Sequence, residues 1–171
     1  IGLTPWTPSM IQRTLVLMGG AVGATEHALK HGGAAGNMAG GTHHAHREFG
    51  SGYCVFNDLA VCARHAIEHL GVERVAIVDL DVHQGDGTAT ILADDPRACT
   101  ISVHCSTNFP FRKSVSDHDL PVAPGSGDEV YLDTVREALD ICTAFEPELI
   151  LYQAGVDGLE ADALGKLNVS R

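Results

Sequence analysis

Basic residues are scarce in this chain of 171 residues, which has 11 lysines and arginines against 22 aspartates and glutamates. Binding to a nucleic-acid backbone depends on clusters of Lys and Arg, and the sequence has no such cluster. We therefore expect no direct nucleic-acid binding. The formal net charge of −11 suits a cationic partner, although it serves ordinary solubility equally well.

Long apolar runs are also absent. No stretch approaches the roughly 20 residues of a membrane-spanning helix, and the residues from Ile1 onward have neither a basic segment nor a signal-like apolar one. We expect a cytoplasmic protein without a membrane partner. A hydrophobic content of 44% in a chain of this length is typical of one domain with a proper core.

Paired cysteines are a third absence. The five cysteines are odd in number and form no Cys-x-x-Cys, which argues against a disulfide framework and against a thiolate zinc site. We expect reduced thiols at these positions. The sequence is instead rich in glycine and histidine, with 19 and 10 residues, and most of the histidines lie close to glycines.

Apolar periodicity predicts alternating helices and strands. We expect helices over 10–31, 59–70, 85–92 and 128–145, and apolar strands over 74–79, 99–103 and 148–153, the last of them buried. The stretch 105–127 has no period and is expected to be irregular. The stretch 32–52 is long and glycine-rich, which is typical of a functional loop. The alternation predicts an α/β domain with a mainly parallel sheet.

The most informative stretch follows the strand at 75–78, whose β-branched and alanine residues indicate burial on both faces. If the extended geometry continues, Asp79, Asp81 and His83 share one face at the carboxyl end of the strand, where open α/β sheets bind ligands. Two carboxylates and an imidazole are ligands for Zn²⁺ or Fe²⁺. The alternative is a set of solvated acids at a strand end.

Two other segments supply matching side chains. Asp157 follows the strand at 148–153, and the loop at 32–52 contains the adjacent His43 and His44. Because parallel strands end at one edge of a sheet, Asp157 can complete a metal site of two aspartates and one histidine. The histidine pair needs orienting acids, and Asp79 and Asp86 are available. The alternative for the pair is a histidine-rich surface loop.

Four motifs, in order, resemble the zinc-dependent histone deacetylase family. They are Gly-Gly-Thr-His-His-Ala at 40–45, Gly-Tyr-Cys-Val-Phe-Asn-Asp at 52–58, Asp-Leu-Asp-Val-His-Gln-Gly-Asp-Gly at 79–87 and Ala-Gly-Val-Asp at 154–157. The segments 108–113 and 159–165 are most similar to the class IV branch and its bacterial relatives. The resemblance implies a three-layer αβα, arginase/deacetylase-like fold, and we expect 1–171 to be one such domain truncated at both ends.

The resemblance implies specific metal ligands. Asp81, His83 and Asp157 would bind zinc. A monovalent cation would lie beside it, and potassium suits the oxygen ligands offered. Its ligands would be Asp79, Asp81, the backbone of His83, Ser102 and Val103.

The resemblance also implies catalytic roles. His44, paired with Asp86, would be the general base and then the acid, and His43, paired with Asp79, an electrostatic partner. Together with the metal, His44 would activate a water that attacks the carbonyl of an acetyl-lysine. The tunnel for the lysine stem would be lined by Tyr53, Gly52, Phe109 and Phe111, whose aromatic rings could alternatively belong to the core.

The family's oxyanion-stabilising tyrosine lies in a Gly-Gly-Tyr beyond the equivalent of Arg171. The tyrosines here are Tyr53, Tyr131 and Tyr152, and none has that context. We therefore expect this segment alone to be a slow enzyme. Two other functions remain open, namely hydrolysis of acetylated polyamines or other small amides, and acyl-lysine binding without catalysis.

Overall fold

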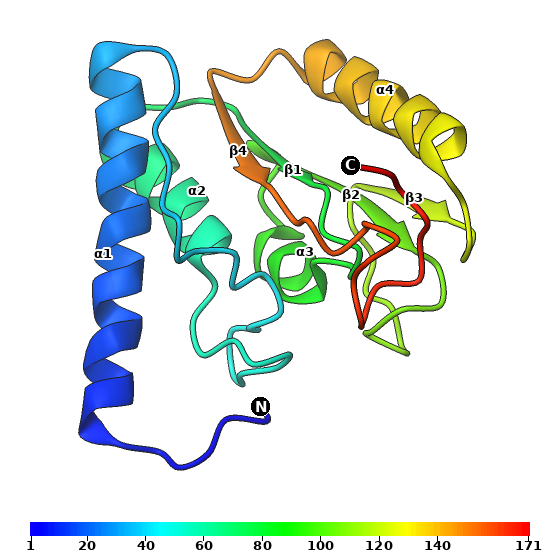
Figure 1. Ribbon diagram of the computed structural model, residues 1–171. Helices are drawn as coiled ribbons and strands as arrows, with labels where there is room; N and C mark the ends of the chain where they lie inside the picture. The colour runs from blue at the N-terminus through cyan, green and yellow to red at the C-terminus, as the bar shows by residue number, and fades with distance from the viewer.

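The computed structural model describes all residues from 1 to 171, and its helices and strands form three layers (Figure 1). All four strands are parallel, in the order β3-β2-β1-β4. This confirms the predicted α/β class and the parallel sheet. The elements are α1 (Pro8–His31), α2 (Asp58–His69), β1 (Val75–Asp79), α3 (Asp86–Leu92), β2 (Ala98–Cys105), β3 (His118–Val122), α4 (Asp128–Phe145) and β4 (Leu149–Gln153).

Strand β1 is buried on both faces. Val75 and Ile77 pack with α1, α2 and α3, whereas Ala76 and Val78 face the core on the side of α4. A strand covered on both sides has apolar residues at every position, which explains its continuous apolar sequence. Full burial of a valine or isoleucine side chain stabilises the fold by about 1.5–3 kcal/mol, so this central strand anchors the residues that follow it.

The two long N-terminal helices start at capping residues. The hydroxyl of Thr7 accepts a hydrogen bond from the N–H of Met10 at 3.2 Å, and Pro8 occupies the first helical position, where no N–H is needed. The side chain of Asn57 accepts from the N–H of Ala60 at 2.9 Å and starts α2. Such a cap contributes about 1 kcal/mol and fixes where the preceding loop must end.

The sequence expectations were wrong at both edges of the sheet. The stretch 105–127 contains strand β3, which lacks an apolar period and includes Pro121. An edge strand tolerates proline, because one side of its backbone has no partner strand. At the opposite edge, β4 is buried on one face only, since Ile150 and Tyr152 are 53% and 59% exposed.

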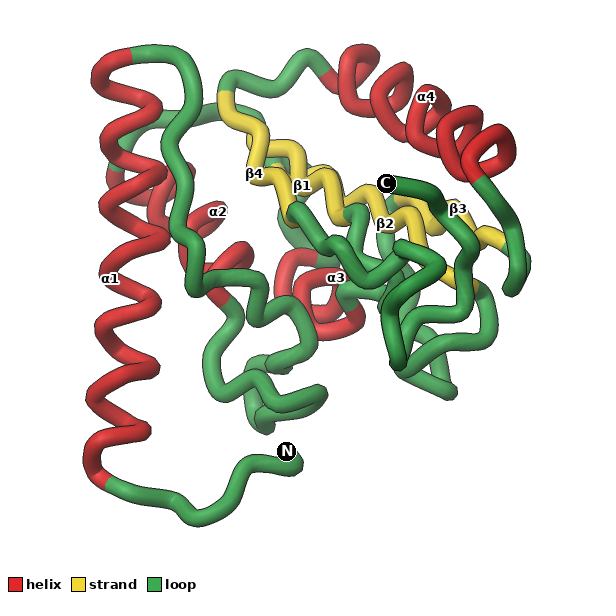
Figure 2. Tube along the Cα trace, viewed as in Figure 1, coloured by secondary structure: helices red, strands yellow, loops and turns green.

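The parallel arrangement places the long loops that follow the strands at one end of the sheet (Figure 2). The glycine-rich loop that precedes α2 lies at the same end, because the backbone N–H of Thr88 in α3 donates to the carbonyl of His43 at 3.0 Å. The polar residues singled out in the sequence are therefore gathered at one end of the sheet.

No helix is both long and apolar enough to cross a membrane.

Candidate active site

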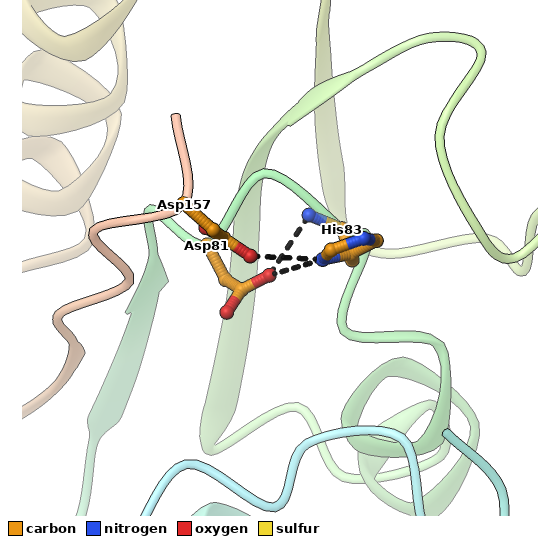
Figure 3. A group of neighbouring side chains, drawn as sticks. All are labelled: Asp81, His83 and Asp157. Carbon is orange, nitrogen blue, oxygen red and sulfur yellow. Dashed lines mark hydrogen bonds and ion pairs between the residues drawn. The ribbon is translucent and has the colours of Figure 1, made fainter. Parts of the chain in front are cut away.

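Three side chains from two loops converge beyond the ends of β1 and β4 (Figure 3). The Nδ1 of His83 lies 3.0 Å from an oxygen of Asp81 and 2.9 Å from an oxygen of Asp157. All three offer a ligand atom within 4.8 Å of the others, and all are partly buried. The structure thus brings together the three residues predicted to bind a metal.

The backbone reaches this arrangement by bending. Strand β1 ends at Asp79 and residues 81–83 are bends, so the predicted continuation of the extended geometry is wrong. The acids themselves hold the bends: Asp79 accepts from the N–H of Asp81 at 3.1 Å, and Asp81 from the N–H of His83 at 2.9 Å. Asp79 is consequently separated from the ligand group, and only Asp81 and His83 reach Asp157.

The chemistry of this donor set fits a divalent cation. Burial lowers the pKa of His83, but hydrogen bonds to Asp157 and Asp81 outweigh it and raise this pKa to about 9. A proton on the imidazole thus balances the two carboxylates, and a metal ion bound to the same atoms can replace it. Gly155 makes room for the group, because a Cβ there would lie 2.4 Å from the Cα of Asp81.

The adjacent histidines each have a buried carboxylate partner. The Nδ1 of His43 lies 2.6 Å from Asp79, and the Nδ1 of His44 lies 2.7 Å from Asp86. The two rings are 4.1 Å apart between centroids. On its other side, the Nε2 of His43 is 3.8 Å from an oxygen of Asp81, which links the pair to the candidate metal ligands.

The surroundings give the two histidines different charges. Burial lowers the pKa of His43, but the charge and hydrogen bond of Asp79 outweigh it and raise this pKa to about 9. At His44 burial dominates, and its pKa is lowered despite the hydrogen bond to Asp86. At neutral pH the site therefore presents one protonated histidine and one neutral histidine that can accept a proton.

The start of α2 holds the loop that carries the pair. The amide of Asn57 donates to the carbonyls of His43 at 3.0 Å and Ala45 at 3.1 Å, and the carboxylate of Asp58 accepts from the N–H of Thr42 at 2.8 Å. From the sequence, no role in the site was assigned to either of these two residues. Their place in the second of the four motifs was the signal for this further role.

The cavity above the histidines has a volume of about 730 Å³, and all four residues predicted to form a tunnel line it. The ring of Phe109 stands edge-on to His44, 4.9 Å away between centroids, and forms the inner wall. Phe111 and Tyr53 are 87% and 69% exposed and belong to the rim. Gly52 provides clearance, since a Cβ there would lie 2.3 Å from the Cδ2 of His44.

Two further buried polar residues lie near the site. Ser102, opposite Asp79 in the β1–β2 register, has its hydroxyl 3.0 Å from the Nδ1 of His104. Asn108 lines the cavity, donates to the carbonyl of Leu164 at 2.8 Å and leaves its own buried oxygen without a partner. Ser102 and the core residue Val103 were predicted to be among the ligands of a potassium ion. Nothing in the structure tests that site, so it stays a prediction.

A model of the histone deacetylase domain matches residues 2–171. The chain belongs to the histone deacetylase family. It is 48% identical over 168 residues to an uncharacterized protein of Picosynechococcus, covering 98% of this chain and 55% of that protein. It is 38% identical over 157 residues to Histone deacetylase 2 of Arabidopsis thaliana, covering 90% of this chain and 40% of the relative.

A solved structure supports the same assignment. The crystal structure of an HDAC homolog from Aquifex aeolicus superposes with a TM-score of 0.83 at 32% identity, covering 92% of this chain and 45% of that one. The predicted deacetylase fold is therefore confirmed. The chain spans about half the length of the relatives it matches.

Proposed function

We propose that the full-length protein containing this chain is a zinc-dependent deacetylase that hydrolyses the acyl amide of a modified lysine side chain. The observation that carries the proposal is the placement of two carboxylate-paired histidines, His43 and His44, in a cavity that also exposes Asp81 and His83 of the candidate metal group. Membership of the histone deacetylase family supports the reaction type.

His44 is suited to move the proton. Its Nδ1 donates to Asp86 at 2.7 Å, which leaves the lone pair of Nε2 free to accept a proton from the attacking water. The imidazolium formed in this step is then stabilised by Asp86 and can return the proton to the leaving amine. General acid–base catalysis of this kind contributes about 10²–10⁴-fold to a rate.

The other charged groups act on the carbonyl. Asp81, His83 and Asp157 would hold the metal, and bound Zn²⁺ would supply a Lewis acid for the carbonyl and for the attacking water. His43 stays protonated and adds a fixed positive charge where negative charge develops on the carbonyl oxygen. Asp79 keeps that charge in place by its 2.6 Å contact with His43.

The cavity favours an acyl-lysine over an acetylated polyamine. Phe109 and the rim residues Tyr53 and Phe111 offer apolar surface for a lysine stem. A polyamine carries further positive charge, yet the only carboxylate in the lining is Asp81, and Lys166 adds a like charge. We therefore assign the acyl-lysine of a peptide or protein as the substrate class.

The test uses the full-length protein, its bound metal and a panel of acetyl-lysine peptides and acetylated polyamines. We expect peptide turnover that is lost with a chelator and restored by Zn²⁺. Asp157→Ala should lose the metal, whereas His44→Ala should keep it and lose about 10²–10⁴-fold in kcat. Turnover that is independent of metal, or faster with polyamines than with peptides, would contradict the proposal.

A further inference from the structure

Asp86 has a second histidine on its other carboxylate oxygen. The Nδ1 of His44 lies 2.7 Å from Oδ1 of Asp86, and the Nε2 of His46 lies 3.2 Å from Oδ2. The carboxylate itself is buried, with 5% of its residue surface exposed. Two imidazoles therefore contact one buried carboxylate from two sides, although the sequence had suggested only the first of them.

His46 is held on three sides. Its Nδ1 lies 2.7 Å from the hydroxyl of Thr90 in α3, and its ring stacks on Phe49 with centroids 4.4 Å apart and planes 23° apart. The hydroxyl of Thr90 also donates to the carbonyl of Gly87, at 3.0 Å, next to Asp86. Both ring nitrogens of His46 are thus engaged.

A carboxylate bound at one oxygen only can turn about its terminal torsion, and its hydrogen-bonded partner turns with it. A donor on each oxygen fixes the plane of Asp86 and hence the orientation of the His44 ring. The second donor also shares the negative charge, so that Asp86 attracts the proton of His44 less strongly. The other titratable groups that face His44 are His43, Asp81 and His83, whose ring lies 6.0 Å away between centroids.

We propose that His46 is a positioning residue for the deacetylation reaction: by holding Oδ2 of Asp86, it fixes the carboxylate that orients the general base His44. This inference rests on the proposed function, because it gives His46 its role through that base. His46 itself does not line the cavity and would touch no substrate.

The decisive variant is His46→Phe, measured in the full-length protein with an acetyl-lysine peptide. Phenylalanine retains the stacking on Phe49 and removes both hydrogen bonds. We expect kcat to fall about 10- to 100-fold, the usual cost of losing an outer partner of a catalytic group, with KM nearly unchanged. His46→Gln, which keeps an N–H donor for Asp86, should recover most of the loss.

His65→Phe is the matched control. His65 also pairs with a carboxylate, at 2.9 Å from Glu26, but it lies in α2 outside the cavity. We expect kcat and KM of this variant to equal those of the wild type. Where His46→Phe does not fold, Thr90→Val removes the anchor of the His46 ring, together with the bond to the Gly87 carbonyl, and should lower kcat in the same direction by a smaller factor.

The pH profile separates positioning from a merely structural loss. Without His46, the full charge of Asp86 acts on His44, so the pKa of His44 should rise and the acidic limb of kcat/KM should move to higher pH. A structural loss lowers the whole profile without moving the limb. A normal kcat in His46→Phe, or a reduced kcat with an unmoved limb, would overturn the inference.

An NMR titration of the His44 ring in wild type and His46→Phe distinguishes this inference from the proposed function. A wild-type protein without turnover would refute the deacetylase proposal alone. The coupling through Asp86 would still be tested, since it predicts a higher pKa for His44 in the variant. An identical pKa in the two proteins would refute the coupling whatever the activity.

Discussion

Two histidines that are neighbours in the sequence differ in charge at neutral pH, one protonated and the other neutral, because their partners and burial differ. The charge of Asp79 outweighs the burial of His43, whereas burial of His44 outweighs its bond to Asp86. A proton acceptor and a fixed cation thus lie side by side, with ring centroids 4.1 Å apart. This division of charge supports the proposed roles and makes a prediction about stability.

Because the pKa of His43 is raised to about 9 from 6.5, its proton stabilises the folded state. That contribution is fully present below about pH 6.5 and is lost as the pH rises through about 9. We expect the Tm of the metal-free protein to fall over this range. In His43→Gln the fall should be smaller, although His83, whose pKa is also raised to about 9, still contributes. Parallel Tm curves for the two proteins would contradict the prediction.

At the scale of elements, the sequence was informative wherever burial left a pattern. Strand β1 was predictable because both of its faces are covered, and α4 was predictable because its apolar residues recur with helical spacing. Strand β3 was not, since its residues His118–Val122 have no period and include a proline. Whether a strand lies at the edge depends on the other strands of the sheet, so it cannot be predicted from the five residues of β3 alone.

The same limit applies to the site. Asp81, His83 and Asp157 were grouped correctly because parallel strands end at one edge, although the backbone bends after Asp79 rather than continuing extended. The contact of His46 with Asp86 was missed, because loop residues have no periodicity to place them. Its only sequence signal was a third histidine two residues after His44.

The loop before α2 makes a prediction at this scale through Gly52. Its φ of 49° favours glycine, and a Cβ would also lie 2.3 Å from the ring of His44. Gly52→Ala should therefore displace His44 and lower kcat by at least about 10-fold. Gly33→Ala is the matched control, since Gly33 also has a positive φ, 79°, but open space around it.

Both variants should lose stability from the strained backbone, about 1–2 kcal/mol each. Only Gly52→Ala should lose activity as well, which unfolding curves and kcat measured on the same samples would reveal. Equal kcat values for the two variants would mean that the clearance at Gly52 does not position His44.

At the scale of the whole molecule, the proposed reaction still needs a donor for the developing oxyanion, and none of the three tyrosines of this chain is placed for that role. Tyr131 donates to the carbonyl of Leu80 at 3.4 Å, and burial raises its pKa to about 12. Tyr152 lies exposed on β4. Tyr53 does line the cavity, but at its rim.

Residues 1–171 alone should therefore bind Zn²⁺ but hydrolyse acetyl-lysine slowly. A missing oxyanion donor typically costs about 10²–10³-fold in kcat, and the relatives, which are about twice as long, have room for such a donor outside the matched region. The comparison is kcat and zinc affinity for residues 1–171 against the full-length protein. Equal kcat values would mean that Tyr53, or the metal with His43, already stabilises the oxyanion; weaker zinc binding in the short chain would instead place a ligand beyond Asp81, His83 and Asp157.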